Sequence, residues 1–189
     1  MKIESPAFTI NDFRGVAEEL AGTEQRWLAE RLERASNEML ELASHIPDEA
    51  ATDEGEWNAK EILAHIAVAS QGWGAIGYML ARGRTTDLAA QDVIRQRDPI
   101  AMASMSQPVA DLARQAATAH QRTIRYLRSA PANEYLNRFT WEFGEGSADF
   151  IFRIMLTAHL EQHVAQLAEV LGANSVGEDP SKQPAQAGA

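Results

Sequence analysis

Residues 58–82 read NAKEILAHIAVASQGWGAIGYMLAR, and this stretch predicts a long amphipathic helix. Asn58 can cap its start, and Glu61 stands at the third helical position, as in a capping box. Trp57 and Ile62 fit a hydrophobic staple across that cap. Gly83 follows as a stop signal. The apolar side chains recur every three or four residues, at Ile62, Ile66, Ala69, Trp73, Ile76 and Leu80.

Three other segments show the same period and predict further long helices. Their stripes are Leu28, Leu32, Ala35, Met39, Leu42 and Ile46; Val109, Ala113, Ala116, His120, Thr123 and Leu127; and Phe152, Leu156, His159, His163, Leu167 and Val170. The second of these helices should run from Pro108 to Arg128, and the last should end at Gly172. Strand patterns are nearly missing. The class is therefore all-α, and four long helices predict a four-helix bundle.

The segments between these helices differ in length and composition. Residues 84–107 form a polar connection, a long crossover between the second and third long helices, with a short helix expected at 88–95. Residues 135–147 hold many large side chains and should pack down as a loop. Residues 11–21 predict a separate short helix, broken at Gly22-Thr23. We expect one domain over 1–172, with 1–22 as an N-terminal extension and 173–189 as a disordered tail.

Composition excludes several classes of function. The chain has 189 residues, and 17 basic against 27 acidic side chains give a net charge of −10, which argues against nucleic-acid binding. It contains no cysteine, so any metal must be held by His, Asp or Glu. No apolar run is long enough to span a membrane, and no signal peptide is evident at the N-terminus. These features predict a cytoplasmic protein.

The histidines carry the strongest chemical signal. His159 and His163 stand four residues apart on an apolar stripe, so both rings should point into the bundle. His65 flanks the buried stripe of the 58–82 helix. Three inward imidazoles can present a three-nitrogen face to a divalent ion, leaving positions for water or substrate. The alternative is a set of hydrogen-bonded core histidines. The pattern is not HExxH, so a zincin protease is not indicated.

Other polar residues have a structural and a functional interpretation. His45 is expected to cap a helix C-terminus, and His120 is either a hydrogen-bonded core histidine or a further ligand. Glu61 either caps its own helix or supports the site as a base or a partner of a ligand. Glu142 and Glu145 lie in the loop before the last helix, where a base is conceivable but solvated charges are the simpler interpretation.

Two motifs resemble those of a known family. Residues 57–65 read WNAKEILAH, which resembles the Trp-x-x-x-Glu-x-x-x-His segment opening the second helix of DinB-like proteins. Residues 159–166 read HLEQHVAQ, which resembles their last-helix motif. The resemblance extends over about residues 27–171. It implies a four-helix bundle with a long crossover, often as a dimer.

The resemblance also implies a metal site. His65, His159 and His163 match the family's ligand triad position by position, for nickel, zinc or a similar ion, and Gln166 either orients His163 or fills a helix seam. The family includes enzymes that use small thiols such as mycothiol or bacillithiol. We therefore expect a metal-dependent thiol S-transferase or hydrolase acting on a small molecule. The alternative is a non-enzymatic bundle that binds a partner, either metal-stabilised or metal-free.

Overall fold

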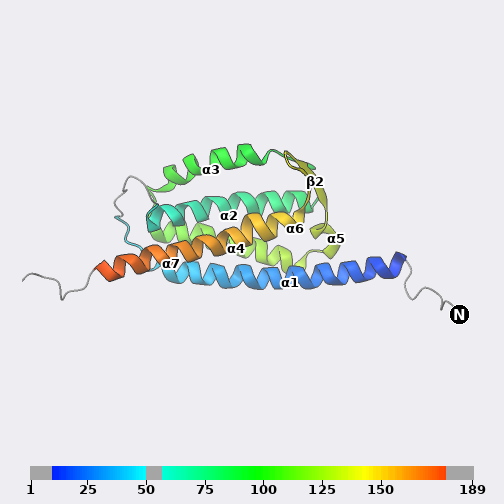
Figure 1. Cartoon of the computed structure of the whole chain (residues 1–189), viewed down its shortest axis with the longest axis horizontal. Coiled ribbons are helices and arrows are strands. Elements are labelled where there is room, and N and C mark those ends of the chain that lie inside the picture. The colour runs from blue at the N-terminus through cyan, green and yellow to red at the C-terminus, as the bar shows by residue number, and fades with distance from the viewer. Residues whose placement is uncertain (1–9, 50–56, 178–189) are drawn as a thin grey trace, which may run out of the picture.

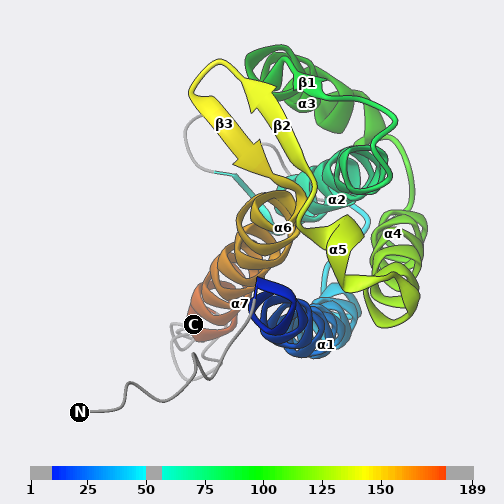
Figure 2. The same cartoon turned by 90° about the vertical axis from the view of Figure 1, so that its right-hand side faces the viewer.

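The computed structural model describes residues 10–49 and 57–177. Four long helical rods make up most of it: α1 (Ile10–Ala43), α2 (Ala59–Ala81), α4 (Val109–Ser129) and a last rod formed by α6 (Ala148–Phe150), the π-helix η1 (Ile151–Ala158) and α7 (His159–Gly177). Seen end-on, the rods surround a common core, with α1 packed against α4 and α7, and α2 packed against α4 and the last rod (Figure 2). The predicted all-α four-helix bundle is confirmed.

The predicted apolar stripes form this core. On α4 every member of the stripe is buried, including His120 and Thr123. On α2 the stripe is buried except for Ile76, which is partly buried against the core. The side chains of Trp73, Phe152 and Tyr135 are the largest that are fully buried. Burial of about 25 cal/mol per Å² of apolar surface is the main driving force for assembling such a bundle.

The first helix is longer than predicted. The expected break at Gly22-Thr23 is wrong, because α1 runs without interruption from Ile10 to Ala43. The Thr23 hydroxyl donates to the carbonyl of Glu19 within the helix, 3.0 Å away. Ala21 is buried, and α5 (Ala132–Tyr135) packs against α1 there. This packing offsets the roughly 1 kcal/mol that a glycine costs inside a helix. Residues 1–9 of the predicted extension lie outside the described part of the chain.

The crossover between α2 and α4 holds a longer helix than predicted. α3 (Ala90–Ser104) lies along α2 and continues through Pro99 (Figure 1). A proline removes one intrahelical hydrogen bond, and this loss is tolerable in α3 because most of that helix faces solvent. The first amides of α3 are satisfied from outside the helix: the Glu142 carboxylate accepts from the N–H groups of Ala90 and Gln91, both at 3.1 Å.

Residues 135–147 do pack down, but partly as strands rather than as a loop. β2 (Arg138–Trp141) pairs antiparallel with β3 (Gly144–Ser147), and the short β1 (Asp87–Leu88) adds to β2 in parallel. Gly144 closes the hairpin with φ +112°, a conformation that favours glycine. Phe139 is buried under the hairpin. Strands this short give no period that a sequence pattern can reveal.

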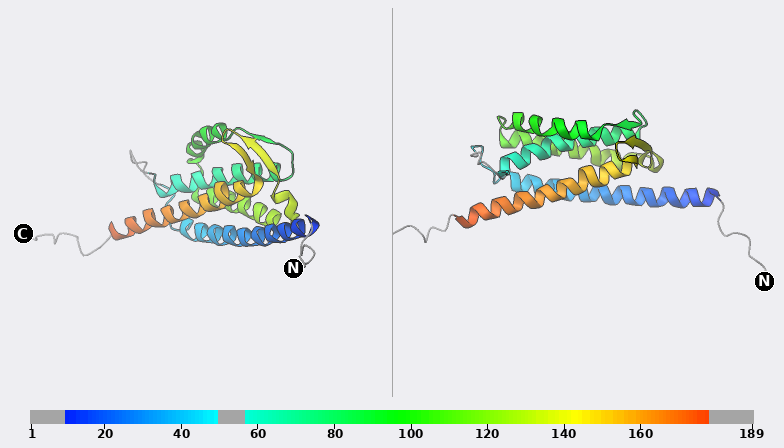
Figure 3. Two further views of the ribbon diagram at one scale, coloured as in Figure 1. Left: turned by 45° about the vertical axis from the view of Figure 1, so that its right-hand side comes forward. Right: turned by 45° about the horizontal axis from the view of Figure 1, so that its top comes forward.

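The last helix also extends beyond its predicted end. The backbone of α7 remains helical past Gly172 to Gly177, and it runs obliquely past α1 (Figure 3). Residues 178–189, in the predicted tail, lie outside the described part of the chain. Among the described helices, none combines the length and the apolar character needed to cross a bilayer.

Candidate metal centre

The start of α2 fixes the position of the first histidine. The Asn58 side chain accepts from the Glu61 N–H at 2.9 Å, and the Glu61 carboxylate accepts from the Asn58 N–H at 2.8 Å. This is the predicted capping box, with both hydrogen bonds formed. His65 follows one turn after Glu61, on the side of α2 that faces α7, and is only 2% exposed.

A π-helix sets the direction of the other two histidines. In η1 the hydrogen bonds span five residues rather than four, and the N–H of His159 donates to the carbonyl of Ile154. The Thr157 hydroxyl follows the same spacing and donates to the carbonyl of Phe152 at 2.8 Å. The wider turns change the direction in which the side chains after η1 point, relative to a regular α-helix, directly before His159. As a result His159 and His163 sit at the edge of the buried face, half-buried rather than fully inside.

The three imidazoles converge on one point. His159 Nε2 lies 3.2 Å from His65 Nε2 and 3.1 Å from His163 Nε2. One ring nitrogen from each histidine falls within 4.8 Å of the others. The predicted triad is therefore brought together, from two helices, although His65 and His159 lie 94 positions apart in the sequence.

The triad stays neutral at ordinary pH. Burial, and after it the charge of Arg97, lowers the pKa of His65 to about 3. Burial and then the neighbouring His163 lower the pKa of His159 to about 4. Burial also lowers the pKa of His163, although its hydrogen bond to Gln166 acts in the opposite direction. Neutral imidazoles keep the lone pairs that a metal ion requires.

A hydrogen bond behind the His163 ring fixes its tautomer, and a carboxylate lies behind the His65 ring. The Nδ1–H of His163 donates to Gln166 Oε1 at 2.9 Å, which leaves the lone pair on Nε2. His65 Nδ1 is buried and has no hydrogen-bond partner among the described residues. The carboxylate oxygen Asp98 Oδ1 on α3 lies 3.6 Å from it. A carboxylate in this place is a common support for a histidine that binds metal.

These observations test whether the residues fit a metal ion. The Nε2 atoms of His65 and His163 both lie within 3.2 Å of His159 Nε2 in a mostly buried site, and Gln166 leaves the lone pair of His163 on its Nε2. One ring N–H can make a good hydrogen bond to only one of the other two nitrogens, whereas a cation between them can accept a lone pair from all three. Three imidazole nitrogens suit zinc, nickel and similar ions. The arrangement fits a divalent transition metal, with ligands on one side only.

Trp57 belongs to the site, which its predicted role as a staple did not anticipate. Its ring lies 4.7 Å from the His65 ring and 6.1 Å from the His163 ring, centre to centre. The side chain is 37% exposed, so it covers the histidines from the solvent side. The sequence signal for this position was present, because Trp57 opens the same motif that contains His65.

The other candidates lie away from the triad. His120 is fully buried between two serines, with Nδ1 2.9 Å from Ser36 Oγ and Nε2 2.7 Å from Ser70 Oγ, so it is a hydrogen-bonded core histidine. His45 is exposed beyond the end of α1. Glu142 caps α3, and Glu145 pairs with Arg138 at 2.9 Å. Asp98 and Arg97 do lie at the site, but the sequence analysis missed them. Nothing in the crossover sequence indicates that this segment packs beside the triad.

A scan against protein-family models matches the DinB superfamily over residues 31–167. The match covers most of the chain and includes α2, α4 and the three histidines. The chain belongs to the DinB superfamily. Membership agrees with the bundle, the long crossover and a triad that could hold a metal ion. No curated protein and no solved structure matched the chain. The first turns of α1 lie outside the DinB match.

Proposed function

We propose that this DinB-superfamily chain is a metal-dependent enzyme of thiol S-transferase or hydrolase type. His65, His159 and His163 hold a zinc or nickel ion, and a small molecule is the substrate. The observation that carries the proposal is the convergence of three Nε2 atoms, two of them on half-buried side chains. A structural site closes with four protein ligands, whereas this one offers three.

The metal would supply Lewis acidity, which activates a thiol or a water molecule at neutral pH. The chain's own residues do the rest. Gln166 holds the proton on Nδ1 of His163 and so keeps that ring in one tautomer. Trp57 limits access of water to the triad and offers an apolar face to the substrate. Arg97, with a side chain only 18% exposed, pairs with Asp98 at 2.9 Å and so holds that carboxylate beside the triad.

Glu61 remains a proposed base. Its Oε2 atom accepts the capping hydrogen bond from Asn58, and it lies one turn before His65 on α2. Replacement by Gln keeps a side-chain oxygen for the cap and removes the basic carboxylate. If Glu61 is the base, Glu61→Gln loses activity but keeps its metal and melting temperature. If Glu61 only caps the helix, activity is unchanged.

The first experiment is elemental mass spectrometry of the untagged protein. Wild type should carry close to one zinc or nickel ion per chain, and the variants His65→Ala, His159→Ala and His163→Ala should lose it. His45→Ala is the matched control, because His45 is an exposed histidine outside the triad. A wild-type protein that stays metal-free after reconstitution with both ions would overturn the metal site.

Activity is then tested separately with the metal-loaded protein. A screen of thiol conjugation and ester hydrolysis should give turnover that disappears in His159→Ala. A different result would favour the alternative, a metal-stabilised binding protein: one metal ion per chain that raises the melting temperature but gives no turnover. An ion held by His65 on α2 and by His159 and His163 on α7 ties the two helices together and so stabilises the fold. The proposal also includes a homodimer, which light scattering of the purified protein measures.

A further inference from the structure

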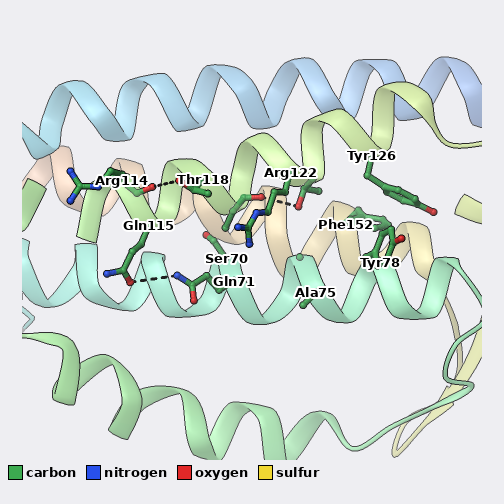
Figure 4. Close-up of a pocket in the computed structure, with 13 residues that line it drawn as sticks. Ser70, Gln71, Ala75, Tyr78, Arg114, Gln115, Thr118, Arg122, Tyr126 and Phe152 are labelled. Carbon is green, nitrogen blue, oxygen red and sulfur yellow. Dashed lines mark hydrogen bonds between the residues drawn. The ribbon is translucent and has the colours of Figure 1, made fainter. Parts of the chain in front are cut away.

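A cavity lies between α2 and α4, on a face of α2 that the triad does not use. Its volume is about 770 Å³, within the usual range for small-molecule sites. None of the three histidines lines it. Figure 4 shows it as a hollow between the two helices, with side chains from both pointing toward it.

The cavity exists because small residues lie between two pairs of large ones. At one end Gln71 and Gln115 approach each other to 3.5 Å across the helices. At the other end the rings of Tyr78 and Tyr126 meet edge to face, 5.1 Å apart. Gln71 and Tyr78 are seven positions apart on α2, which corresponds to a length of about 10 Å along the helix. The cavity is therefore closed at both ends and open along its side.

The floor is apolar and tightly packed. Phe152 from η1 lies beneath the hollow, and it is fully buried. Gly77 leaves room for its ring, since a Cβ atom there would lie 2.7 Å from Phe152 Cε1. Between the two ends, α2 contributes Gly74 and Ala75, whose side chains are absent or a single methyl. Because Phe152 is already fully buried, the apolar surface that a ligand can bury here comes from Ala75 and the ring of Tyr78.

The charge of the lining is opposite to that of the protein. Two arginines and no carboxylate line the cavity, although the chain as a whole carries −10. Arg114 is paired with Asp111 at one end. Arg122 makes no ion pair or side-chain hydrogen bond with any residue that the structure describes. Figure 4 shows its guanidinium between the ribbons of α4 and α2, directed at the hollow.

We propose that the α2–α4 cavity binds a small organic anion with an apolar body of about two aromatic rings, whose acid group pairs with Arg122. The guanidinium is free to donate two parallel hydrogen bonds to a carboxylate or sulfonate. The apolar body lies on Gly74 and Ala75 between the glutamine pair and the tyrosine pair. This site is independent of the metal and of the proposed enzymatic function.

The test uses two fluorescent probes with the same apolar body. One is 1-anilinonaphthalene-8-sulfonate, and the other is the neutral N-phenyl-1-naphthylamine. The sulfonate should bind wild type saturably at one site per chain, and Arg122→Gln should weaken it about tenfold, the factor that a loss of 1.4 kcal/mol produces. The neutral probe should bind Arg122→Gln and wild type equally.

Two variants separate the cavity from general surface binding. Arg125→Gln removes an exposed arginine of α4 that does not line the cavity, and it should leave binding of the sulfonate unchanged. Ala75→Leu fills the hollow from an exposed position and should weaken both probes, with the circular dichroism spectrum unchanged. His159→Ala should bind the sulfonate as wild type does, which excludes the metal centre as its site.

Three results would overturn the proposal. The first is the absence of saturable binding of the sulfonate to wild type. The second is an equal loss of affinity in Arg122→Gln and Arg125→Gln, which would indicate attraction by surface charge alone. The third is unchanged binding of both probes to a folded Ala75→Leu variant, which would place the bound probe outside this cavity.

Discussion

Lowering the pH from 7 to 5 should destabilise this protein through His120, a buried histidine outside the metal centre. Its ring lies at the centre of the bundle, where it joins Ser36 of α1 to Ser70 of α2. A neutral ring donates to one serine and accepts from the other. Burial lowers the pKa of His120 to about 4, because a charged ring would lose its hydration in the core.

The sign and size of the effect follow from this shift. The folded-state pKa lies below the ordinary value of 6.5, so the unfolded chain binds more protons between these two values. Stability is therefore complete above pH 6.5 and is lost as the pH falls toward 4. One pKa unit corresponds to about 1.4 kcal/mol, so the loss between pH 7 and pH 5 is about 2 kcal/mol.

Urea unfolding followed by circular dichroism measures this loss. Wild type and His120→Gln are unfolded at both pH values in the presence of a chelator. The amide of Gln can hydrogen-bond to a serine and does not titrate, so this variant keeps a polar group in place without the proton uptake. The histidines of the triad contribute equally to both proteins and cancel in the difference.

The decisive quantity is the change in unfolding free energy between the two pH values, compared between the proteins. Wild type should lose about 2 kcal/mol more than His120→Gln. If both proteins lose the same amount, His120 does not titrate with a lowered pKa, and the reasoning from its burial is refuted. A lower stability of His120→Gln at pH 7 alone does not bear on this comparison.

Two further substitutions test the packing and the metal centre. Gly77→Ala should destabilise the protein by about 1–2 kcal/mol in thermal unfolding, because the new methyl group meets the buried ring of Phe152. Gly72→Ala on the same helix meets nothing within 4 Å and should instead be neutral or stabilising by up to about 1 kcal/mol; equal effects would refute the proposed steric conflict. Asp98→Asn should weaken zinc binding about tenfold in a competition titration with a chromogenic chelator, because the carboxylate nearest His65 Nδ1 is lost. Unchanged affinity would show that Asp98 does not support that ring.

The sequence alone determined the elements whose signals are local. A capping box and a regular apolar stripe define α2 because both depend on residues within a few turns. The spacing of His159 and His163 also depends only on neighbouring residues, since two positions four apart lie on one face of a helix. His65 could be joined to them only through its position beside a buried stripe and through the DinB motifs.

Only the tertiary structure decided the features that depend on contacts between distant segments. α1 continues through Gly22 because α5 packs on it, and α3 continues through Pro99 although a proline predicts an interruption. The π-helix before His159 packs against α2 and α1, and the sequence pattern did not predict it. Trp57, Asp98 and the α2–α4 cavity acquire their roles from neighbours brought together by folding. Local hydrogen bonds and periodicity can be read along a chain, whereas burial and convergence of side chains exist only once the helices have packed.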